Sequence, residues 1–305
     1  MSNNYDLIII GGGIAGMTAA IYAARANVKT LLLEKSVCGG LVNSTHVVEN
    51  FPSYESINGM DLMEKVRDHV DAVGVSVIEV IEIEDIKLSG DIKVVDTDEG
   101  EFTAPAVILA SGREPRKLPI ESDLEQIHYC AICDGTGYKD KDVIVVGGGN
   151  SGVDESLYMI SLGVKSILLI EEFEKLFASE TTSEQLRACE NVEIRTSTKI
   201  ESLIGDDRLE GVTLRNLKND TLEDRPINGI FVYIGQDPQT DQYKTQVGLD
   251  DSGYIQVDQD MKTDTPGVFA AGDVIHKKYR QITTAMGDAT VAALSAVEYL
   301  SSIKN

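Results

Sequence analysis

The residues best suited to chemistry in this sequence are two cysteines, Cys130 and Cys133, in a C-x-x-C arrangement that Asp134 follows directly. Thiol–disulfide exchange needs a thiolate that attacks and a second thiol near enough to resolve the mixed disulfide. The C-x-x-C spacing supplies both, and it commonly lowers the pKa of one thiol. Asp134 is adjacent to Cys133, so it could move a proton as a general acid. The stretch therefore predicts a redox-active disulfide.

A metal half-site is the other chemistry open to a C-x-x-C pair. A tetrahedral zinc ion would need two further ligands. Cys38 and Cys189 are single cysteines, and the four histidines form no ligand pair, although His128 lies near Cys130. We therefore expect no metal, and we interpret Cys38 and Cys189 as plain core or surface residues.

A glycine-rich turn at residues 11–16, Gly-Gly-Gly-Ile-Ala-Gly, follows an apolar strand predicted over 5–10 and opens a helix predicted over 14–26. Its first, third and last glycines would permit the tight turn, the approach of a pyrophosphate and close packing of helix on strand. The helix N-terminus offers N–H donors to phosphate. Glu34, after a strand predicted over 29–33, is placed to accept hydrogen bonds from a ribose. This pattern predicts dinucleotide binding.

The same order of elements recurs in the second half of the chain. A strand predicted over 142–146 leads into a second glycine turn at 147–152, and a helix over 153–162 and a strand over 166–170 follow. Glu171 then stands about twenty residues past the turn, where an NAD site has its ribose-binding acid. The sequence thus predicts a duplicated nucleotide-binding plan.

Strands alternating with helices in this way indicate an α/β fold with two Rossmann-like, three-layer dinucleotide-binding domains. Residues 113–119 hold two prolines and four charged side chains, which is typical of a linker between domains. Over 75–102, β-branched residues alternate with acids between turn signals, and this pattern predicts an antiparallel meander.

Composition and charge narrow the range of partners. The 305 residues carry a formal net charge of −23, which argues against nucleic acid and against an anionic membrane surface as partners. No apolar run approaches the roughly 20 residues that cross a bilayer. The first residues carry no basic leader, so we expect a cytoplasmic protein.

With these motifs in place, the sequence resembles the low-molecular-weight thioredoxin reductases, a branch of the two-dinucleotide-binding flavoproteins. The resemblance runs over nearly the whole chain, and the order and spacing of its motifs fit. These motifs are the GGGIAG turn with Glu34, the VVENFP loop, the YCAICDG stretch, the VVGGGNSG turn, the TPGVFAAGDV segment and the pair Arg280-Gln281.

The resemblance implies a discontinuous FAD-binding domain, residues 1–112 plus 240–305, into which a dithiol domain of residues 116–239 is inserted. It implies a homodimer in which Cys133 faces the flavin and Cys130 exchanges with the substrate. It also implies the residues that hold FAD, carried over by motif: Gly11, Gly13, Ile14, Ala15, Gly16, Glu34, Lys35, Gly40, Leu41, Asn50, Gly112, Gly272, Asp273, Arg280, Gln281 and Ile282.

One segment departs from the family pattern. NADPH-using members carry a basic cluster after the second strand of the inserted domain, where this chain has Glu171, Glu172, Phe173 and Phe177. Carboxylates would repel a 2′-phosphate, so the segment argues against NADPH. NADH remains open, with a site built from Gly147, Gly149, Asn150, Ser151, Gly152 and Glu171.

Reduced ferredoxin is the second donor that remains open, since some family members have lost nicotinamide use. Ferredoxins are usually acidic, so docking would need a basic patch on this acidic chain. The candidates for that patch are Arg113, Arg116 and Lys117, or Lys277, Lys278 and Arg280.

The sequence therefore predicts a flavin-dependent thioredoxin-disulfide reductase. Electrons would pass from NADH or ferredoxin to FAD, then to the Cys130–Cys133 dithiol, and then to thioredoxin or a thioredoxin-like protein. The alternatives are a reductase of another small redox protein, such as a glutaredoxin-like carrier, and a non-catalytic flavoprotein that acts as a redox sensor.

Overall fold

The computed structural model describes residues 3–122 and 124–304, and the chain forms two compact units. The first unit consists of Met1–Glu114 and Asp237–Asn305, and the second, inserted unit consists of Pro115–Gln236. The predicted ranges differ from these by a few residues at each crossing. The chain crosses between the units in two short strands that pair with each other, β8 (Arg113–Pro115) and β17 (Gln236–Pro238).

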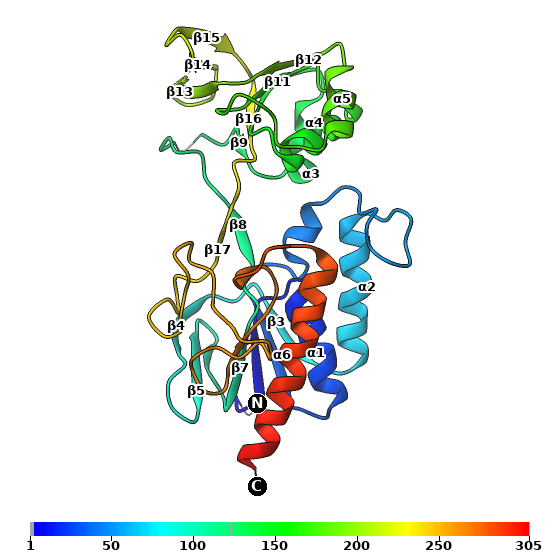
Figure 1. Cartoon of the computed structure of the whole chain (residues 1–305), viewed down its shortest axis with the longest axis vertical. Coiled ribbons are helices and arrows are strands. Elements are labelled where there is room, and N and C mark those ends of the chain that lie inside the picture. The colour runs from blue at the N-terminus through cyan, green and yellow to red at the C-terminus, as the bar shows by residue number, and fades with distance from the viewer. Residues whose placement is uncertain (1–2, 123, 305) are drawn as a thin grey trace. The chain divides into compact units, whose positions relative to one another are not determined.

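The first unit is built on a five-stranded parallel sheet with the order β18-β7-β1-β2-β3. Three helices, of which α1 and α6 lie side by side, pack together in this unit (Figure 1). The main elements are β1 (Leu7–Ile10), α1 (Ile14–Arg25), β2 (Thr30–Glu34), α2 (Gly59–Ala72), β3 (Ser76–Glu79), β7 (Ala106–Leu109), β18 (Val268–Ala270) and α6 (Ile282–Ile303), with short 3-10 helices η1 (Gly40–Ser44) and η3 (Gly272–Val274).

Both faces of this sheet are buried, which explains why its strands read as continuous apolar runs. In β1, Leu7 and Ile9 pack with the alanine-rich faces of α1 and α6, whereas Ile8 and Ile10 pack into a second core. That second core includes an antiparallel sheet of β4 (Ile83–Lys87), β5 (Lys93–Thr97) and β6 (Gly100–Ala104). The result is three layers.

The second unit repeats the plan with a parallel sheet of order β12-β11-β10-β16-β9. Alternate residues of β10 pack toward helices on one face and toward the antiparallel sheet β13-β14-β15 on the other. Its elements are β9 (Ile127–His128), α3 (Ala131–Asp134), η2 (Gly135–Tyr138), β10 (Asp142–Val146), α4 (Asn150–Ser161), β11 (Ser166–Ile170), α5 (Glu180–Arg187), β12 (Val192–Arg195), β13 (Thr198–Ile204), β14 (Gly211–Asn216), β15 (Leu222–Pro226) and β16 (Gly229–Val232). The predicted α/β class with two dinucleotide-binding domains is confirmed.

Two local predictions need correction. The stretch 75–102 is not all meander, because β3 joins the parallel sheet beside β2, and only β4 to β6 are antiparallel. The helix predicted over 153–162 is α4, which begins at Asn150 instead of residue 153 and has Gly149, in an extended conformation, as its N-cap. Both errors arise because short apolar stretches carry too little periodicity to fix their partners or their first turn.

Within the described part of the chain, every helix is too short or too polar to be a membrane-spanning segment.

Candidate active site

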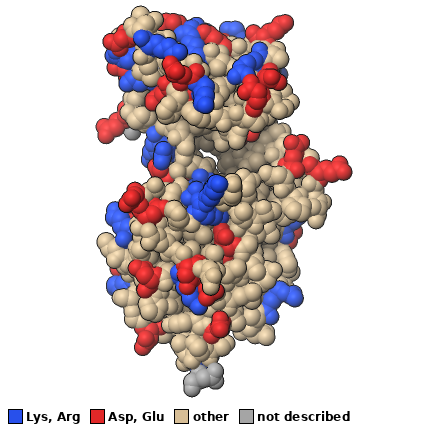
Figure 2. All heavy atoms as spheres, in the orientation of Figure 1, with Lys and Arg blue, Asp and Glu red and all other residues tan. Residues whose placement is uncertain are grey.

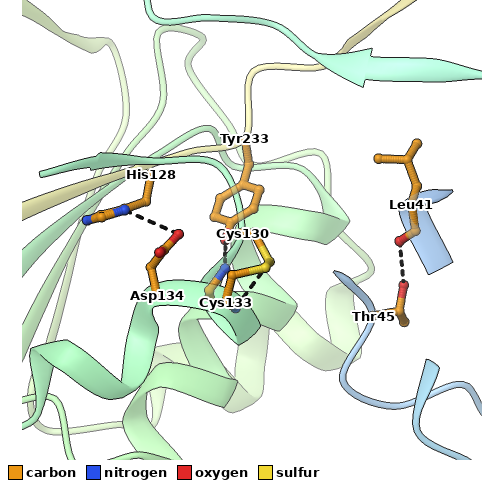
Figure 3. The surroundings of a disulfide bond; sticks show 8 residues. Leu41, Thr45, His128, Cys130, Cys133, Asp134 and Tyr233 are labelled. Carbon is orange, nitrogen blue, oxygen red and sulfur yellow. Dashed lines mark hydrogen bonds and ion pairs between the residues drawn. A yellow bond between two sulfur atoms is a disulfide. The ribbon is translucent and has the colours of Figure 1, made fainter. Parts of the chain in front are cut away.

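The C-x-x-C pair lies at the start of α3 in the second unit. Cys130 and Cys133 are joined there by a disulfide bond, with their Cα atoms 5.4 Å apart. Cys130 is the N-cap of α3, and its Sγ accepts a hydrogen bond from the Cys133 N–H at 3.2 Å (Figure 3). The hydroxyl of Tyr233, just past β16, accepts the Ala131 N–H at 3.0 Å. The backbone of the C-x-x-C turn is therefore held from two directions.

Asp134 is part of a short polar chain that continues away from the cysteines. Its Oδ2 lies 3.2 Å from Nδ1 of His128, and Nε2 of His128 lies 2.6 Å from the hydroxyl of Tyr138 (Figure 3 shows the first pair). The His128 ring also packs against Phe231, with ring centroids 5.0 Å apart. Both ring nitrogens are thus engaged within the protein, which leaves neither for a metal ion.

Burial sets the protonation of this chain. Desolvation lowers the pKa of His128, while the neighbouring Asp134 acts in the opposite direction. Desolvation also raises the pKa of Tyr138, and the Asp134 charge adds to that rise. Near neutral pH the imidazole is therefore uncharged, so the Asp134–His128 contact is a hydrogen bond that can hold the carboxylate in place.

Two further residues near the C-x-x-C turn, Glu155 and Tyr233, belong to no motif that the sequence shows. Burial raises the pKa of Glu155, on α4, to about 7, and the charge of Asp154 contributes. Glu155 Oε2 is buried without a hydrogen-bond partner. Burial and the Glu155 charge together raise the pKa of Tyr233. A glutamate in the middle of a helix looks like a surface residue in the sequence, and only the packing of α4 changes its chemistry.

Glu155 should make stability fall as pH rises. Its pKa is about 7 in the folded protein against 4.5 for the ordinary group, so the folded state keeps a proton that the unfolded state loses between these values. Integrated over this window, the loss is about 3 kcal/mol. We expect Glu155→Gln to remove this slope and to be more stable than the unaltered protein at pH 8 in urea unfolding. Glu184→Gln, on exposed α5, is the control; parallel pH curves for Glu155→Gln and the unaltered protein would contradict the assignment.

The first glycine turn forms a cradle for a phosphate group. Gly11 has a φ of +105°, and a Cβ at Gly16 would stand 1.8 Å from the Gly11 carbonyl oxygen, so neither position accepts a side chain. A Cβ at Gly13 would meet nothing within 4 Å, so its backbone faces open space. Ile14 and Ala15 form the first turn of α1, whose N-terminus has no side-chain cap. These uncapped N–H groups suit a pyrophosphate.

Segments distant in the sequence complete this cradle. The Gly39 N–H donates to the Gly12 carbonyl at 2.9 Å, and a Cβ at Gly40 would lie 3.3 Å from the Gly13 Cα. Leu41 follows in η1, half-buried. Gly272, at the start of η3, packs against Ala15, since a Cβ there would stand 2.7 Å from the Ala15 Cβ.

Glu34 ends β2 and turns its carboxylate toward the turn. Its Oε2 accepts the Gly12 N–H at 2.6 Å, and its Oε1 accepts the Ser36 N–H at 2.9 Å. The adjacent Lys35 forms an ion pair with Glu114 instead. Glu34 is thus held against the glycine turn, whereas Lys35 pairs with a residue at the end of the unit.

Several of the remaining predicted cofactor residues are joined by side-chain contacts. Asn50 Nδ2 donates to Gln281 Oε1 at 3.1 Å, and Gln281 is the N-cap of α6, which Ile282 begins. Asp273 Oδ2 accepts from Arg113 Nη2 at 2.8 Å. The sequence placed Arg113 in the linker or in a docking patch, whereas in the structure it pairs with Asp273.

Three buried polar atoms of the first unit fit a bound flavin dinucleotide. Arg113 Nε, Asp273 Oδ1 and Arg280 Nε are buried without a hydrogen-bond partner, although Lys277 Nζ lies 3.4 Å from Asp273 Oδ1. Gly112, with a φ of +66°, has open space at its Cβ position. Unpaired buried polar groups are costly, and a ligand with hydroxyls and phosphates would satisfy them. The residues present therefore suit FAD.

A methyl group at Gly13 tests the cradle without disturbing the fold. The space at this position is open and its φ of −69° suits any residue, so Gly13→Ala should fold normally while its methyl enters the pyrophosphate position. We expect FAD to bind about ten- to a hundredfold more weakly, as measured by flavin retained after gel filtration. Gly149→Ala, the matched change in the second unit, should retain FAD; full retention in Gly13→Ala would show that the pyrophosphate lies elsewhere.

The second glycine turn repeats this geometry. Gly147 has a φ of +111°, a Cβ at Gly152 would stand 2.0 Å from the Gly147 carbonyl oxygen, and Gly149 faces open space. Asn150 and Ser151 begin α4, which also lacks a side-chain cap on its N-terminus, and Asn150 Oδ1 accepts the Ser179 N–H at 2.9 Å. All predicted residues of this turn therefore come together at one helix N-terminus.

Glu171 closes the second turn as Glu34 closes the first. Its Oε2 accepts the Gly148 N–H at 2.7 Å, its Oε1 accepts the Phe173 N–H at 3.1 Å, and the residue is only 8% exposed. In both units an acid at the end of the second strand accepts the middle N–H of the glycine turn. The two glycine turns and their acids therefore share one local geometry.

Comparisons with known proteins agree with this geometry. The family model for pyridine nucleotide-disulphide oxidoreductase matches residues 5–289. A 34.2 kDa protein in the rubredoxin operon of Clostridium pasteurianum is 40% identical, with 97% of each chain covered. A thioredoxin reductase from Streptomyces coelicolor is 38% identical, covering 100% of this chain and 97% of that one.

The crystal structure of Lactococcus lactis thioredoxin reductase superposes with a TM-score of 0.91 at 36% identity, covering 98% of this chain and 99% of that one. The family predicted from the motifs is thereby confirmed. The chain belongs to the pyridine nucleotide-disulphide oxidoreductase family and is a FAD-dependent disulfide oxidoreductase.

Proposed function

We propose that this protein uses NADH to reduce a disulfide in thioredoxin or a similar small redox protein. The environment of Glu171 is the observation that favours NADH as the donor. Like Glu34, Glu171 accepts one N–H of the glycine turn and the N–H two residues after itself. A carboxylate at this position accepts from a free 2′-hydroxyl and repels a 2′-phosphate. Glu172, exposed beside it, adds to that repulsion.

The names of the relatives support the substrate. The proteins from Streptomyces coelicolor and Lactococcus lactis are thioredoxin reductases, and both align with this chain over nearly their full lengths. The C-x-x-C turn, with its disulfide formed, is the group through which such an exchange would pass. The homodimer implied by the resemblance remains a prediction.

Ferredoxin is less well supported as the donor. Two members of the basic patches that could receive it are largely buried in ion pairs: Arg113 with Asp273, and Lys277 with both Asp273 and Asp288. On the face shown in Figure 2, acidic and basic side chains are interspersed over both units. An acidic ferredoxin would therefore meet a chain of net charge −23 with much of its local basic charge already paired.

The two cysteines would carry out the exchange. When bound, FAD supplies two-electron transfer between a nicotinamide and a disulfide. In the reduced protein the Cys130 thiolate attacks one sulfur of the partner's disulfide, and the other sulfur leaves and takes a proton. The Cys133 thiolate then attacks Cys130 Sγ, restores the internal disulfide and releases the second sulfur of the partner, which takes the second proton. Two electrons thus pass to the partner.

Asp134 is the acid–base group closest in sequence to this chemistry, and His128 holds its side chain. We expect Asp134→Asn to lower kcat for disulfide reduction about a hundredfold. His128→Gln should cost about tenfold and change the acidic limb of the pH profile, because the imidazole no longer fixes the carboxylate. Tyr138→Phe, which removes only the far hydroxyl, should cost least. Identical pH profiles in all four proteins would remove this chain from the mechanism.

The donor is tested directly by anaerobic titration of the yellow protein. NADH, NADPH and reduced ferredoxin are added to separate samples, and the flavin absorbance is followed by stopped flow. We expect rapid bleaching by NADH and much slower bleaching by NADPH. Bleaching by ferredoxin alone would overturn the proposed donor and leave the second glycine turn with a structural role only.

A further inference from the structure

The loop between β11 and α5 presents two exposed aromatic rings. Phe173 and Phe177 are 63% and 56% exposed, and their rings meet edge to face with centroids 5.4 Å apart. An aromatic pair left in water forms an apolar patch, and such patches mark binding surfaces more often than single exposed residues do.

The backbone that carries these rings is fixed to the second glycine turn. The Phe177 N–H donates to the Gly148 carbonyl at 2.8 Å, and the Phe173 N–H donates to Glu171 Oε1 at 3.1 Å. The Phe173 carbonyl in turn accepts the Ser197 N–H at 2.8 Å. The loop is therefore anchored at both phenylalanines, and two of its three attachment points, Gly148 and Glu171, belong to the glycine turn and acid of the proposed dinucleotide site.

We propose that Phe173 and Phe177 form a subsite for the adenine ring of NADH. This inference rests on the proposed function, because it takes Glu171 to hold the adenosine ribose. Adenine is joined to that ribose by a single glycosidic bond, so the base must lie close to the residues that contact the sugar. Phe173 follows Glu171 by two positions and is bonded to its carboxylate through the backbone. Aromatic side chains bind the π-face of a base without needing a particular hydrogen-bond pattern.

The charges around the rings suit a base without a phosphate at the 2′ position. Glu172 and Glu174 are exposed on the same loop, and they flank Phe173 in the sequence. Two lysines that contact this loop are already engaged: Lys175 lies over the Phe177 ring at 5.8 Å, and Lys218 pairs with Glu174 at 3.4 Å. The subsite would thus bind the dinucleotide by stacking instead of by the phosphate charge that NADPH-using relatives exploit.

The test uses ADP-ribose, which contains the adenosine half of NADH and no nicotinamide. Its binding to the FAD-loaded protein is measured by isothermal titration calorimetry. We expect about tenfold weaker binding in Phe173→Ala or Phe177→Ala and up to about a hundredfold in the double variant. Phe173→Tyr should bind like the unaltered protein. Ile92→Ala, which removes a similarly exposed apolar side chain from the first unit, is the control for non-specific loss.

The outcomes separate this inference from the function on which it rests. Weaker binding in the alanine variants with recovery in Phe173→Tyr supports the subsite. Unchanged ADP-ribose affinity in the double alanine variant, while NADH still bleaches the flavin, would overturn the subsite and leave the donor standing. Absence of ADP-ribose binding to the unaltered protein would overturn both the subsite and the proposed donor.

Discussion

Cys133→Ser is expected to abolish disulfide reduction, with turnover at least about a thousandfold below that of the unaltered protein. Without the Cys133 thiol the internal disulfide cannot form, and a mixed disulfide at Cys130 cannot be resolved. Flavin binding should persist, because the residues that we expect to hold FAD all lie in the first unit and the two cysteines lie in the second. The measurement is steady-state reduction of a thioredoxin, with whichever donor bleaches the flavin.

Two matched variants sharpen this result. Cys130→Ser should be equally inactive in turnover, since it removes the thiol that attacks the partner. Cys189→Ser should behave like the unaltered protein, because Cys189 lies just past α5, where its thiol donates to the Gln185 carbonyl. Full turnover in Cys133→Ser, or a loss of comparable size in Cys189→Ser, would remove the C-x-x-C pair from the electron path.

Glu171→Gln should raise the KM for NADH about ten- to a hundredfold. The change removes a carboxylate that accepts two backbone N–H groups at 2.7 and 3.1 Å in a site that is 8% exposed. Hydrogen bonds to a charged acceptor contribute about 1.5–3 kcal/mol each, and the new amide places its own N–H₂ toward a backbone donor. The ribose contact and the shape of the turn are weakened together. The readout is the rate of flavin bleaching as a function of NADH concentration.

The symmetry of the two units supplies controls for this variant. Glu34→Gln, the same change in the first unit, should loosen FAD instead of NADH. Gly149→Ala keeps the fold, because its Cβ position is open, yet should also weaken NADH binding. Glu172→Gln, at an exposed neighbour, should raise the KM little. An unchanged KM in both Glu171→Gln and Gly149→Ala would mean that NADH, if it reduces the protein, does so from another site.

We expect the ionisation of Glu155 to change the reactivity of the nearby cysteines near neutral pH. Glu155, with a pKa of about 7, changes protonation in the same range in which a C-x-x-C thiol commonly ionises. Because Glu155 also raises the pKa of Tyr233, which holds the Ala131 N–H, its charge reaches the dithiol turn through one hydrogen bond. A change near pH 7 in the rate of Cys130 alkylation by iodoacetamide that disappears in Glu155→Gln would show this coupling.

The parts of this protein that depend on local spacing could be predicted from the sequence. The C-x-x-C pair needs only two intervening residues, and each glycine turn is specified by the strand before it and the helix after it. In both turns the acid at the end of the next strand, Glu34 or Glu171, could be placed from the sequence because parallel neighbouring strands end at the same edge of the sheet.

Three-dimensional packing sets which distant side chains meet and how burial changes their chemistry. His128 was a weak metal candidate in the sequence, and only the packing of α3, η2 and β16 around it makes it the partner of Asp134 and Tyr138. The Asn50–Gln281 hydrogen bond joins residues 231 positions apart. The raised pKa of Glu155 comes mainly from desolvation. Contacts of this kind depend on how separate elements pack and on the water that packing removes, and neither is written in the spacing of residues along one strand or helix.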